Sequence, residues 1–303
     1  MARTLDIMLP FYGRFDHLRA AVDSVIAQTD TDWRLTVVDD VYPDPAPGDW
    51  VRSLEDPRIL YLRNEVNLGV SGNYLRCVEL MQDDFGVLFG CDDVMLPGYV
   101  ARVKELLAAH SDAAVVQPGV EVIDDDGRVY RPLVDRIKGH YRVGGSGIRV
   151  LVGEDLAVSL LRGNWTYFPA LVWRVETLRR FGFHPELIVV QDLIMLMDIV
   201  ADGGTFILDD EVVFQYRRHQ HSVSSAMATD GSRFVQERRL FDSERERYER
   251  MGWKRAATAA RRHGSSKLNA LTRIPAALRA GDLSGIRDLV THAAGRRIRS
   301  RAG

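Results

Sequence analysis

The chain has 303 residues, of which 46% are hydrophobic and 27% are charged, and its formal net charge at pH 7 is -2. This composition is typical of a globular protein with a sizeable core, and it gives no whole-molecule reason to expect nucleic acid as a partner. The two cysteines, Cys77 and Cys91, are too few for a disulfide scaffold or a thiolate metal site, and they favour a reducing compartment.

The N-terminal residues MARTLDIMLPFYG predict no signal peptide, because Asp6 and Pro10 interrupt a stretch that is already short. No run approaches the ~18 uncharged apolar residues of a membrane span. We therefore expect a cytoplasmic protein. Charge is uneven, however: residues 231–303 hold 18 Lys and Arg against 7 Asp and Glu, whereas residues 1–230 hold 22 against 35. An acidic body and a basic tail indicate two regions with different roles.

Strand and helix patterns alternate over the first 117 residues. Short apolar runs predict five strands, at 4–10, 33–40, 58–64, 85–90 and 113–119. Apolar residues at helical spacing predict three helices, at 14–28, 70–81 and 97–110, the last with Pro97 in its first turn. This alternation predicts a mostly parallel sheet with helices on both faces, and ligands bind such sheets outside the carboxyl ends of the strands.

The alternation of strand and helix patterns becomes less regular after residue 120. The segment VEVIDDDGRVY predicts a hairpin with an Asp-Gly turn, and the Gly-rich segment 138–149 predicts a loop. Further along, the patterns predict a helix at 154–162, a strand at 168–174, a buried helix at 191–204, two last strands from TFILDD and EVVFQYRRH, and Arg- and Ala-rich helices after 230.

Two pairs of carboxylates follow predicted strands. Asp92 and Asp93 end the run GVLFGC, and two like charges this close repel unless a cation lies between them. Mg²⁺ or Mn²⁺ held together with a diphosphate meets that need, while an N-cap for the next helix is the alternative. Asp39 and Asp40 suit a hydrogen bond from a nucleobase or a ribose hydroxyl, or else an Asx-turn.

Three other groups have residue types suited to the same chemistry. Asp192 lies at the start of a predicted buried helix. Its carboxylate suits a general base that takes a proton from a hydroxyl, and the alternative is a helix cap. Gly69 and Gly72 at a helix start suit an anion. The segment after the last predicted strand holds Arg217, Arg218, His219 and His221. Arginine suits phosphate and histidine suits a metal, and the alternative is a solvated strand end.

The order of these groups along the chain resembles the family 2 glycosyltransferases of the GT-A fold, from about residue 4 to 225. The segments that carry the resemblance are IMLPFYGRFDHLRAAVDSVIAQTDTDWRLTVVDD, ILYLRNEVNLGVSGN, LFGCDDVMLPGYV, VQDLIMLMDIVADGG and YRRHQHSVS. The resemblance implies a Rossmann-like sheet and an inverting transferase that uses a nucleotide-diphospho-sugar, with a UDP-sugar favoured, and Mn²⁺ or Mg²⁺. A nucleotidyltransferase or a non-catalytic nucleotide-sugar-binding module is the alternative.

The resemblance also implies roles for single residues. Asp192 would be the catalytic base, Asp93 would bind the metal, and Asp92 would contact the ribose or the metal, with His219 joining the metal or diphosphate. The nucleotide would meet the expected binding set of Pro10, Phe11, Tyr12, Arg14, Asp39, Asp40, Asn67, Gly69 and Asn73. Contacts with diphosphate or acceptor are expected from Arg217, Arg218, His221, Trp165 and Tyr167, although core packing is an alternative for Trp165 and Tyr167.

Four positions depart from the family's usual pattern. Gly90 stands where an acidic residue often opens the metal motif, Gly13 replaces Asn, Val41-Tyr42 replaces Gly-Ser, and Gln191 replaces Glu beside the base. The Gly90 change leaves one carboxylate fewer for a metal. The Gln191 change removes a charge next to Asp192.

The expected organisation is a GT-A nucleotide-sugar-binding and catalytic domain over 1–225, followed by a basic helical region over 226–303. Within the first, residues 1–118 would form the nucleotide-binding half and 119–225 the acceptor half. Expected partners are the nucleotide-sugar donor and a sugar, glycan or glycolipid acceptor. The basic region has three alternatives: packing on the acidic body, a homodimer surface, or peripheral contact with the inner face of a membrane.

Overall fold

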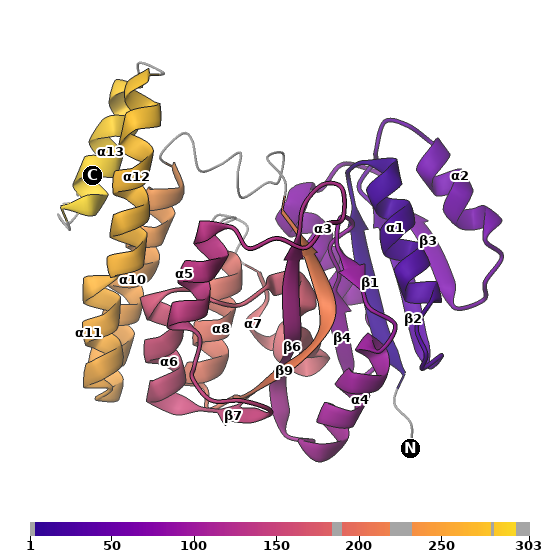
Figure 1. Cartoon of the computed structure of the whole chain (residues 1–303), viewed down its shortest axis with the longest axis horizontal. Coiled ribbons are helices and arrows are strands. Elements are labelled where there is room, and N and C mark those ends of the chain that lie inside the picture. The colour runs from indigo at the N-terminus through magenta and orange to yellow at the C-terminus, as the bar shows by residue number, and fades with distance from the viewer. Residues whose placement is uncertain (1–3, 184–189, 219–231, 280–281, 295–303) are drawn as a thin grey trace.

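Four apolar segments of the first ninety residues form a parallel sheet. The computed structural model describes residues 4–183, 190–218, 232–279 and 282–294 (Figure 1). Within it, the strands lie in the order β3-β2-β1-β4, and each pairs in parallel with its neighbours. Their bounds are β1 (Leu5–Phe11), β2 (Trp33–Asp39), β3 (Ile59–Arg63) and β4 (Phe85–Leu88).

Helices connect these strands and bury both faces of the sheet. They are α1 (Phe15–Ile26), α2 (Ala46–Ser53), α3 (Gly69–Leu80) and α4 (Tyr99–Ala109). Because successive strand residues point to opposite faces, Ile7 and Leu9 lie in the core under α1 and α4, while Met8 lies in the core that includes α3. Pro97 precedes α4 rather than lying in its first turn, and α2 was not expected from the sequence.

The second half of the sheet is mixed. Strand β6 (Ala113–Ile123) runs parallel to β9 (Thr205–Arg217), whereas β8 (Val172–Arg174) lies antiparallel between β4 and β6. Two short strands, β5 (Val94–Met95) and β7 (Arg149–Leu151), pair antiparallel with β9. The sheet is therefore parallel from β3 to β4 and mixed beyond β4.

Strand β9 is one continuous strand where the sequence predicted two. It bends past β6 with register shifts on both sides of Gly119. A Cβ at Gly119 would lie 2.5 Å from the carbonyl oxygens of Asp210 and Glu211, so glycine permits this close approach. The expected hairpin after β6 is present, with Val129 bridging to Ile123.

Several helices complete the body. The expected helices near 154–162 and 191–204 are α6 (Gly153–Arg162) and α8 (Gln191–Ala201). Helix α5 (Leu133–Tyr141) overlaps the segment 138–149 that was predicted as a loop, and α7 (Val175–Phe181) was not predicted. The segment 168–174 divides into a 3-10 turn (Phe168–Ala170) and β8, so only its end is a strand.

In the described part of the chain after β9, four helices gather at the end of the molecule away from β3 (Figure 1). They are α10 (Ser232–Met251), α11 (Lys254–Arg262), α12 (Gly264–Arg279) and α13 (Leu283–Ala293). Helix α11 packs against α6, where Arg255 pairs with Glu154 and Asp155. Helix α10 reaches α8 through Tyr248, whose hydroxyl lies 3.4 Å from the sulfur of Met197. Packing on the body is thus the arrangement of α10 and α11.

Helices α12 and α13 pack on each other and on α10 around a buried polar group. The Oγ of Ser266 lies 2.6 Å from Nε2 of His292 and also donates to Glu237. His292 is fully buried, with His263 and Phe234 against its ring. Burial, with the charges of nearby Arg238 and Lys267, lowers the pKa of His292 to about 3. None of the helices in the described part of the chain is long and apolar enough to span a bilayer.

The neutral state of His292 makes stability depend on pH. Since the folded-state pKa is lower than the ordinary 6.5, its contribution is present above pH 6.5 and is lost as the pH falls below it. His292→Gln keeps a neutral hydrogen-bonding side chain that cannot gain a proton. We expect the wild type to lose more free energy of unfolding than the variant between pH 7.5 and 5.5, as measured by urea unfolding. Equal losses would contradict a buried neutral His292.

Candidate active site

Asp39 ends β2 and is buried among protein donors. Its Oδ1 accepts the backbone N–H of Tyr42 at 2.7 Å. Its Oδ2 accepts from the Tyr61 hydroxyl and, at 2.9 Å, from Arg63, both of which lie on β3. The carboxylate is fully buried, so its contacts join the ends of two neighbouring strands. This is the turn-forming alternative weighed for Asp39, and direct contact with a nucleobase stays a prediction.

Asp40 holds the start of α3 beside the sheet edge. Its carboxylate accepts the backbone N–H groups of Leu68 and Gly69 at 2.8 and 2.9 Å, and the side chain of Asn64. A carboxylate at a helix N-terminus satisfies amides that have no partner in the helix, and the dipole favours its charge. Asn67 donates to the Asp40 carbonyl, and buried Asn73 donates to the Val38 carbonyl. Asn67, Asn73 and Gly69 therefore build the walls of the expected nucleotide-binding region.

Val41 follows in a left-handed backbone conformation, with a φ of 63°. A β-branched residue is rare in this region, and such strain costs on the order of 1–3 kcal/mol. The family that the sequence resembles usually has glycine at this position, and glycine adopts a positive φ without this strain. Next to it, the ring of Tyr42 contacts buried Phe11 at 5.1 Å and exposed Tyr12 at 5.5 Å between centroids. Tyr12 and Tyr42 thus present aromatic surface at this edge.

Asp93 is buried with one carboxylate oxygen unpartnered. Its Oδ1 accepts the backbone N–H of Arg217 at 2.8 Å, and its Oδ2 has no hydrogen-bond partner. Burial first, and the charge of Asp92 second, raise the pKa of this carboxyl well above its ordinary value. A Cβ at Gly90 would overlap Oδ2 of Asp93 and lie 3.1 Å from Oδ1 of Asp92. Asp93 therefore folds into the space that a side chain at position 90 would take.

Arg217 holds the turn that carries the two carboxylates. Its guanidinium is buried and donates to the carbonyl of Asp92 at 2.7 Å and to those of Asp124 and Asp125 at 2.9 and 3.0 Å. The end of β9, the 92–93 turn and the 124–127 turn are thereby joined. These contacts occupy Nε and Nη1 of the guanidinium, and the contact with a diphosphate expected for Arg217 stays a prediction.

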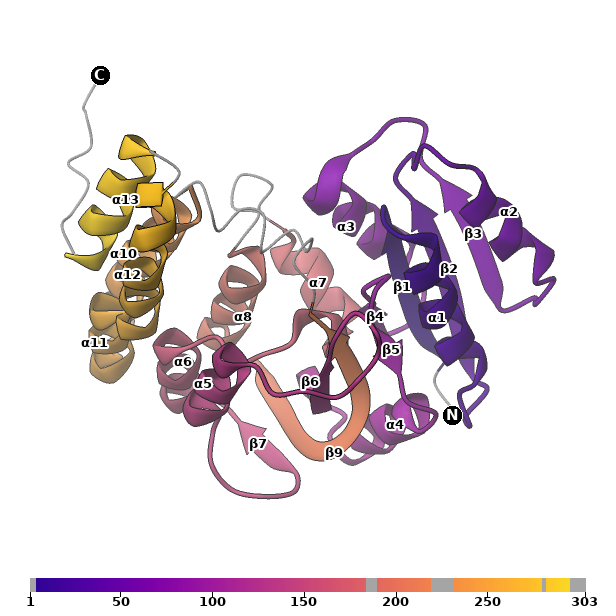
Figure 2. The same cartoon turned by 45° about the horizontal axis from the view of Figure 1, so that its top comes forward.

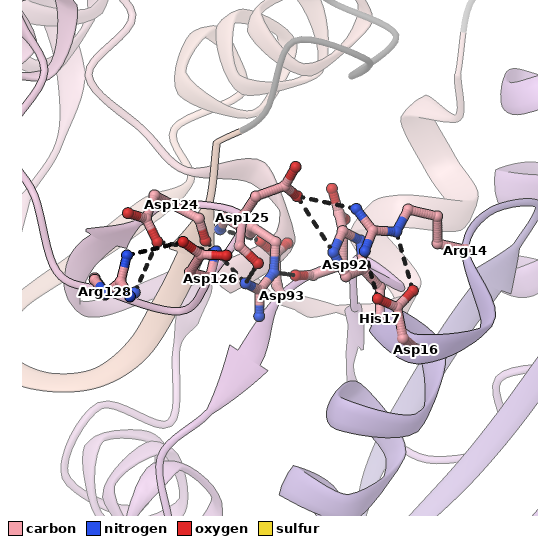
Figure 3. Close-up of polar contacts among 10 residues, drawn as sticks. Arg14, Asp16, His17, Asp92, Asp93, Asp124, Asp125, Asp126 and Arg128 are labelled. Carbon is pink, nitrogen blue, oxygen red and sulfur yellow. Dashed lines mark hydrogen bonds and ion pairs between the residues drawn. The ribbon is translucent and has the colours of Figure 1, made fainter.

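Asp125 connects the hairpin turn to the start of α1. Figure 3 shows its carboxylate directed at Arg14 and His17, with 3.4 Å to the Nη1 of Arg14 and to the Nε2 of His17. Arg14 also pairs with Asp16 and is exposed. Burial lowers the pKa of His17, and the charges of Arg14 and Arg217 add to this. The acidic edge is therefore bordered by Arg14 at the start of α1 and by Arg217 at the end of β9.

Asp192 lies in the first turn of α8, as expected. Its Oδ2 accepts from the side-chain amide of Asn164 at 3.0 Å, and its Oδ1 accepts the backbone N–H of Leu193. The preceding residue, Gln191, accepts from the Ser71 hydroxyl at 2.9 Å, and both side chains are buried. Since Ser71 lies in the first turn of α3, this bond joins the expected base to the helix that Asp40 holds. Asn164 and Ser71 were not predicted. Their partners, Asp192 and Gln191, lie 28 and 120 residues away in the sequence, and no local pattern indicates contacts at such separations.

The candidate acceptor contacts divide in two. Trp165 is 1% exposed, packs on Phe206 and donates to Ser159, which is the core-packing alternative weighed for it. Tyr167 is partly buried and donates to Asp135 at 3.0 Å, and Arg218 pairs with the same carboxylate. Asp135 was missed by the sequence analysis. His219 and His221 lie outside the described residues.

The comparisons with known proteins bear directly on this edge of the sheet. A family model described as Glycosyl transferase family 2 matches residues 6–155, which contain both carboxylate pairs. The chain belongs to glycosyltransferase family 2. An uncharacterized glycosyltransferase of Methanocaldococcus jannaschii is 19% identical over 203 residues, 66% of each chain. The succinoglycan biosynthesis protein ExoO of Rhizobium meliloti is 22% identical over 220 residues, 72% of this chain and 62% of that one. The matched part thus spans less than two thirds of either relative.

Solved structures of similar shape confirm the GT-A fold of this family 2 glycosyltransferase. S. aureus TarS 1-349 in complex with UDP-GlcNAc superposes with a TM-score of 0.62 at 13% identity, covering 98% of this chain and 93% of the other. The mannosyltransferase PcManGT of Pyrobaculum calidifontis, in complex with GDP-Man and Mn²⁺, gives 0.62 at 14% identity, covering 96% and 79%.

The carboxylates of this family 2 chain fit a divalent cation in part. The unpartnered Oδ2 of buried Asp93, with Asp92 beside it, is an arrangement that a cation would neutralise. Within the described residues, however, no three His, Cys, Asp or Glu side chains form a metal site. Mg²⁺ commonly takes only one or two protein carboxylates together with substrate phosphates. Donor oxygens would therefore have to complete the coordination.

The space above Gly90 gives a test of this geometry. In Gly90→Ala the new methyl group must displace the buried Asp93 carboxylate, whose other oxygen is held by Arg217. We expect the free energy of unfolding to fall by about 1–3 kcal/mol in urea titrations. Gly139→Ala is the matched control, because it lies in α5 with no atom within 4 Å of the new Cβ and should stabilise by roughly 0.5–1 kcal/mol. A Gly90→Ala protein as stable as the wild type would contradict the position of Asp93.

Proposed function

We propose that this protein is an inverting glycosyltransferase that moves a sugar from a nucleotide-diphospho-sugar, with a UDP-sugar favoured, to an acceptor hydroxyl in polysaccharide or cell-envelope synthesis. Membership of family 2 and the relative named for succinoglycan biosynthesis support the reaction class and the setting. TarS with UDP-GlcNAc and PcManGT with GDP-Man support a nucleotide-sugar donor. The observation that carries the proposal is Asp192, fixed at a helix N-terminus and joined through Gln191 to the nucleotide half.

Asp192 would act as the general base. The amide of Asn164 orients one carboxylate oxygen, and the N-terminus of α8 favours its charged form. The other face of the carboxylate would take the proton of the acceptor hydroxyl as that oxygen attacks the anomeric carbon opposite the diphosphate. Base catalysis of this kind typically accelerates a reaction ~10²–10⁴-fold. The neutral Gln191 leaves Asp192 without a charged neighbour in its own sequence.

Asp93 and Asp92 would face the leaving group. Oδ2 of Asp93 would hold Mn²⁺ or Mg²⁺, and the ion would neutralise the charge that develops on the departing diphosphate. Arg217 keeps both carboxylates in place through the backbone of their turn. Asp40 keeps the N–H groups of the 68–69 segment ordered at the same edge. The chain thereby holds the carboxylates and the 68–69 amides in place, and the diphosphate of the donor would supply the remaining ligands of the cation.

Asp192→Asn tests the base. The amide keeps the shape of the side chain but cannot accept the proton, so release of UDP from a panel of UDP-sugars with Mn²⁺ should fall by at least ~10²-fold. Nucleotide affinity, measured by calorimetry, should stay within about twofold. Asp202→Asn, at the other end of α8, is the matched control and should retain activity. Full turnover by Asp192→Asn would refute the assignment.

Asp93→Asn separates the metal role from the fold. The raised pKa of Asp93 means that its charge disfavours the folded state above the ordinary carboxyl pKa of 3.8. Without metal, we therefore expect the variant to be more stable at pH 7 by on the order of 1 kcal/mol, a difference that disappears near pH 4. With Mn²⁺ and UDP, the wild type should gain thermal stability and the variant should not. An equal gain in both would contradict metal binding by Asp93.

A further inference from the structure

The outward face of α12 is an apolar stripe. Leu268, Leu271 and Leu278 are 56%, 50% and 61% exposed, and Pro275 between them is exposed as well. The spacing of three, four and three residues places all four on one side of the helix. The opposite side, with Ala270 and Ala277, is buried against α10 and α13. The helix thus exposes its leucines and buries its alanines against α10 and α13. A helix that only packed in its bundle would bury the leucines, which are the larger apolar side chains.

Cationic side chains border this stripe. At 100° per residue, Lys267 and Arg279 fall on its two sides, and both reach solvent. The neighbouring helix α13 adds exposed Val290 and Arg287. Between residues 254 and 294 the sequence holds eight Lys and Arg, and only Asp282 and Asp288 are acidic. A leucine stripe flanked by arginine and lysine is the pattern of helices that lie in a membrane interface.

We propose that the α12 face, defined as Leu268, Leu271, Pro275 and Leu278 with Lys267 and Arg279, docks on an anionic lipid surface. The leucines would enter the boundary between headgroups and acyl chains, and the cations would meet lipid phosphates. A second copy of the chain fits the α12 face less well than an anionic lipid surface does. A two-fold contact through this face would bring the same positive charges together, whereas an anionic bilayer supplies the opposite charge.

The position of the helix agrees with this partner. Helices α12 and α13 form the end of the molecule farthest from β3 (Figures 1 and 2). They are joined to the body through α10 and α11, whose contacts with α8 and α6 were described above. The α12 face includes none of the residues assigned to the nucleotide or the base. Membrane docking and sugar transfer can therefore be tested separately on the same full-length protein.

Sedimentation with vesicles tests the proposal. The full chain should bind vesicles of phosphatidylcholine with 30–50% phosphatidylglycerol and should bind pure phosphatidylcholine at least tenfold more weakly, with affinity falling as salt rises. The triple variant Leu268→Ser, Leu271→Ser, Leu278→Ser should lose at least tenfold in binding. The matched control, Ile148→Ser, Val150→Ser, Val212→Ser, removes three exposed apolar side chains elsewhere and should bind as the wild type does.

Three measurements keep the result unambiguous. Thermal unfolding and UDP-sugar hydrolysis should be unchanged in the triple variant, since the substituted side chains are exposed and distant from Asp192. Lys267→Gln with Arg279→Gln, which leaves the leucines intact, should weaken binding to anionic vesicles and reduce its salt dependence. Wild-type binding by the triple variant, or equal binding to neutral and anionic vesicles, would overturn the proposal. So would a concentration-dependent dimer that the triple variant abolishes, because a second copy would then be the occupant.

Discussion

The buried guanidinium of Arg217 is the contact on which the acidic edge of this protein depends. Five aspartates, at positions 92, 93, 124, 125 and 126, converge there from two separate turns. Arg217 donates to main-chain carbonyls of both turns, and its own backbone N–H donates to Asp93. A single cation from the end of β9 thus fixes the backbone under all of these charges. Its guanidinium bonds only to main-chain carbonyls in these contacts, so it holds the turns without forming an ion pair with the carboxylates that they carry.

In that arrangement Asp93 is the residue of the site whose burial destabilises the folded state. Its second oxygen is buried without a partner, and its pKa is raised by burial and by Asp92. Such an unpaired group disfavours folding, and proteins retain this kind of cost mainly where function requires it. The strained turn at Val41 follows β2, which is separated from β4 by β1 in the same parallel part of the sheet. Both departures from low-energy structure are found at the carboxyl edge of the sheet, where the donor is expected to bind.

Much of the fold follows from local pattern, and the site follows only in part. Within the first 117 residues, the longer strands and the helices α1, α3 and α4 were predicted closely because each carries its own periodicity, whereas α2 and the two-residue strand β5 were not predicted. The single strand β9 was read as two, because its bend past Gly119 depends on a partner some ninety residues away. Likewise, Arg217 was assigned to phosphate from its residue type alone. In the structure its Nε and Nη1 donate to backbone carbonyls, and no sequence pattern identifies such partners. Trp165 shows the same limit, since only packing distinguishes a buried aromatic from a binding one.

The contact between Ser71 and Gln191 has a consequence for how the two halves of the body communicate. It is a hydrogen bond between neutral side chains, buried from solvent, at the junction of α3 and α8. An acidic residue at position 191 would have made this junction sensitive to protonation and to ionic strength. With an amide, neither partner of this hydrogen bond takes up or loses a proton at physiological pH, so the bond itself does not depend on pH. The expected base can then gain or lose its proton while the contact between α3 and α8 beside it stays neutral.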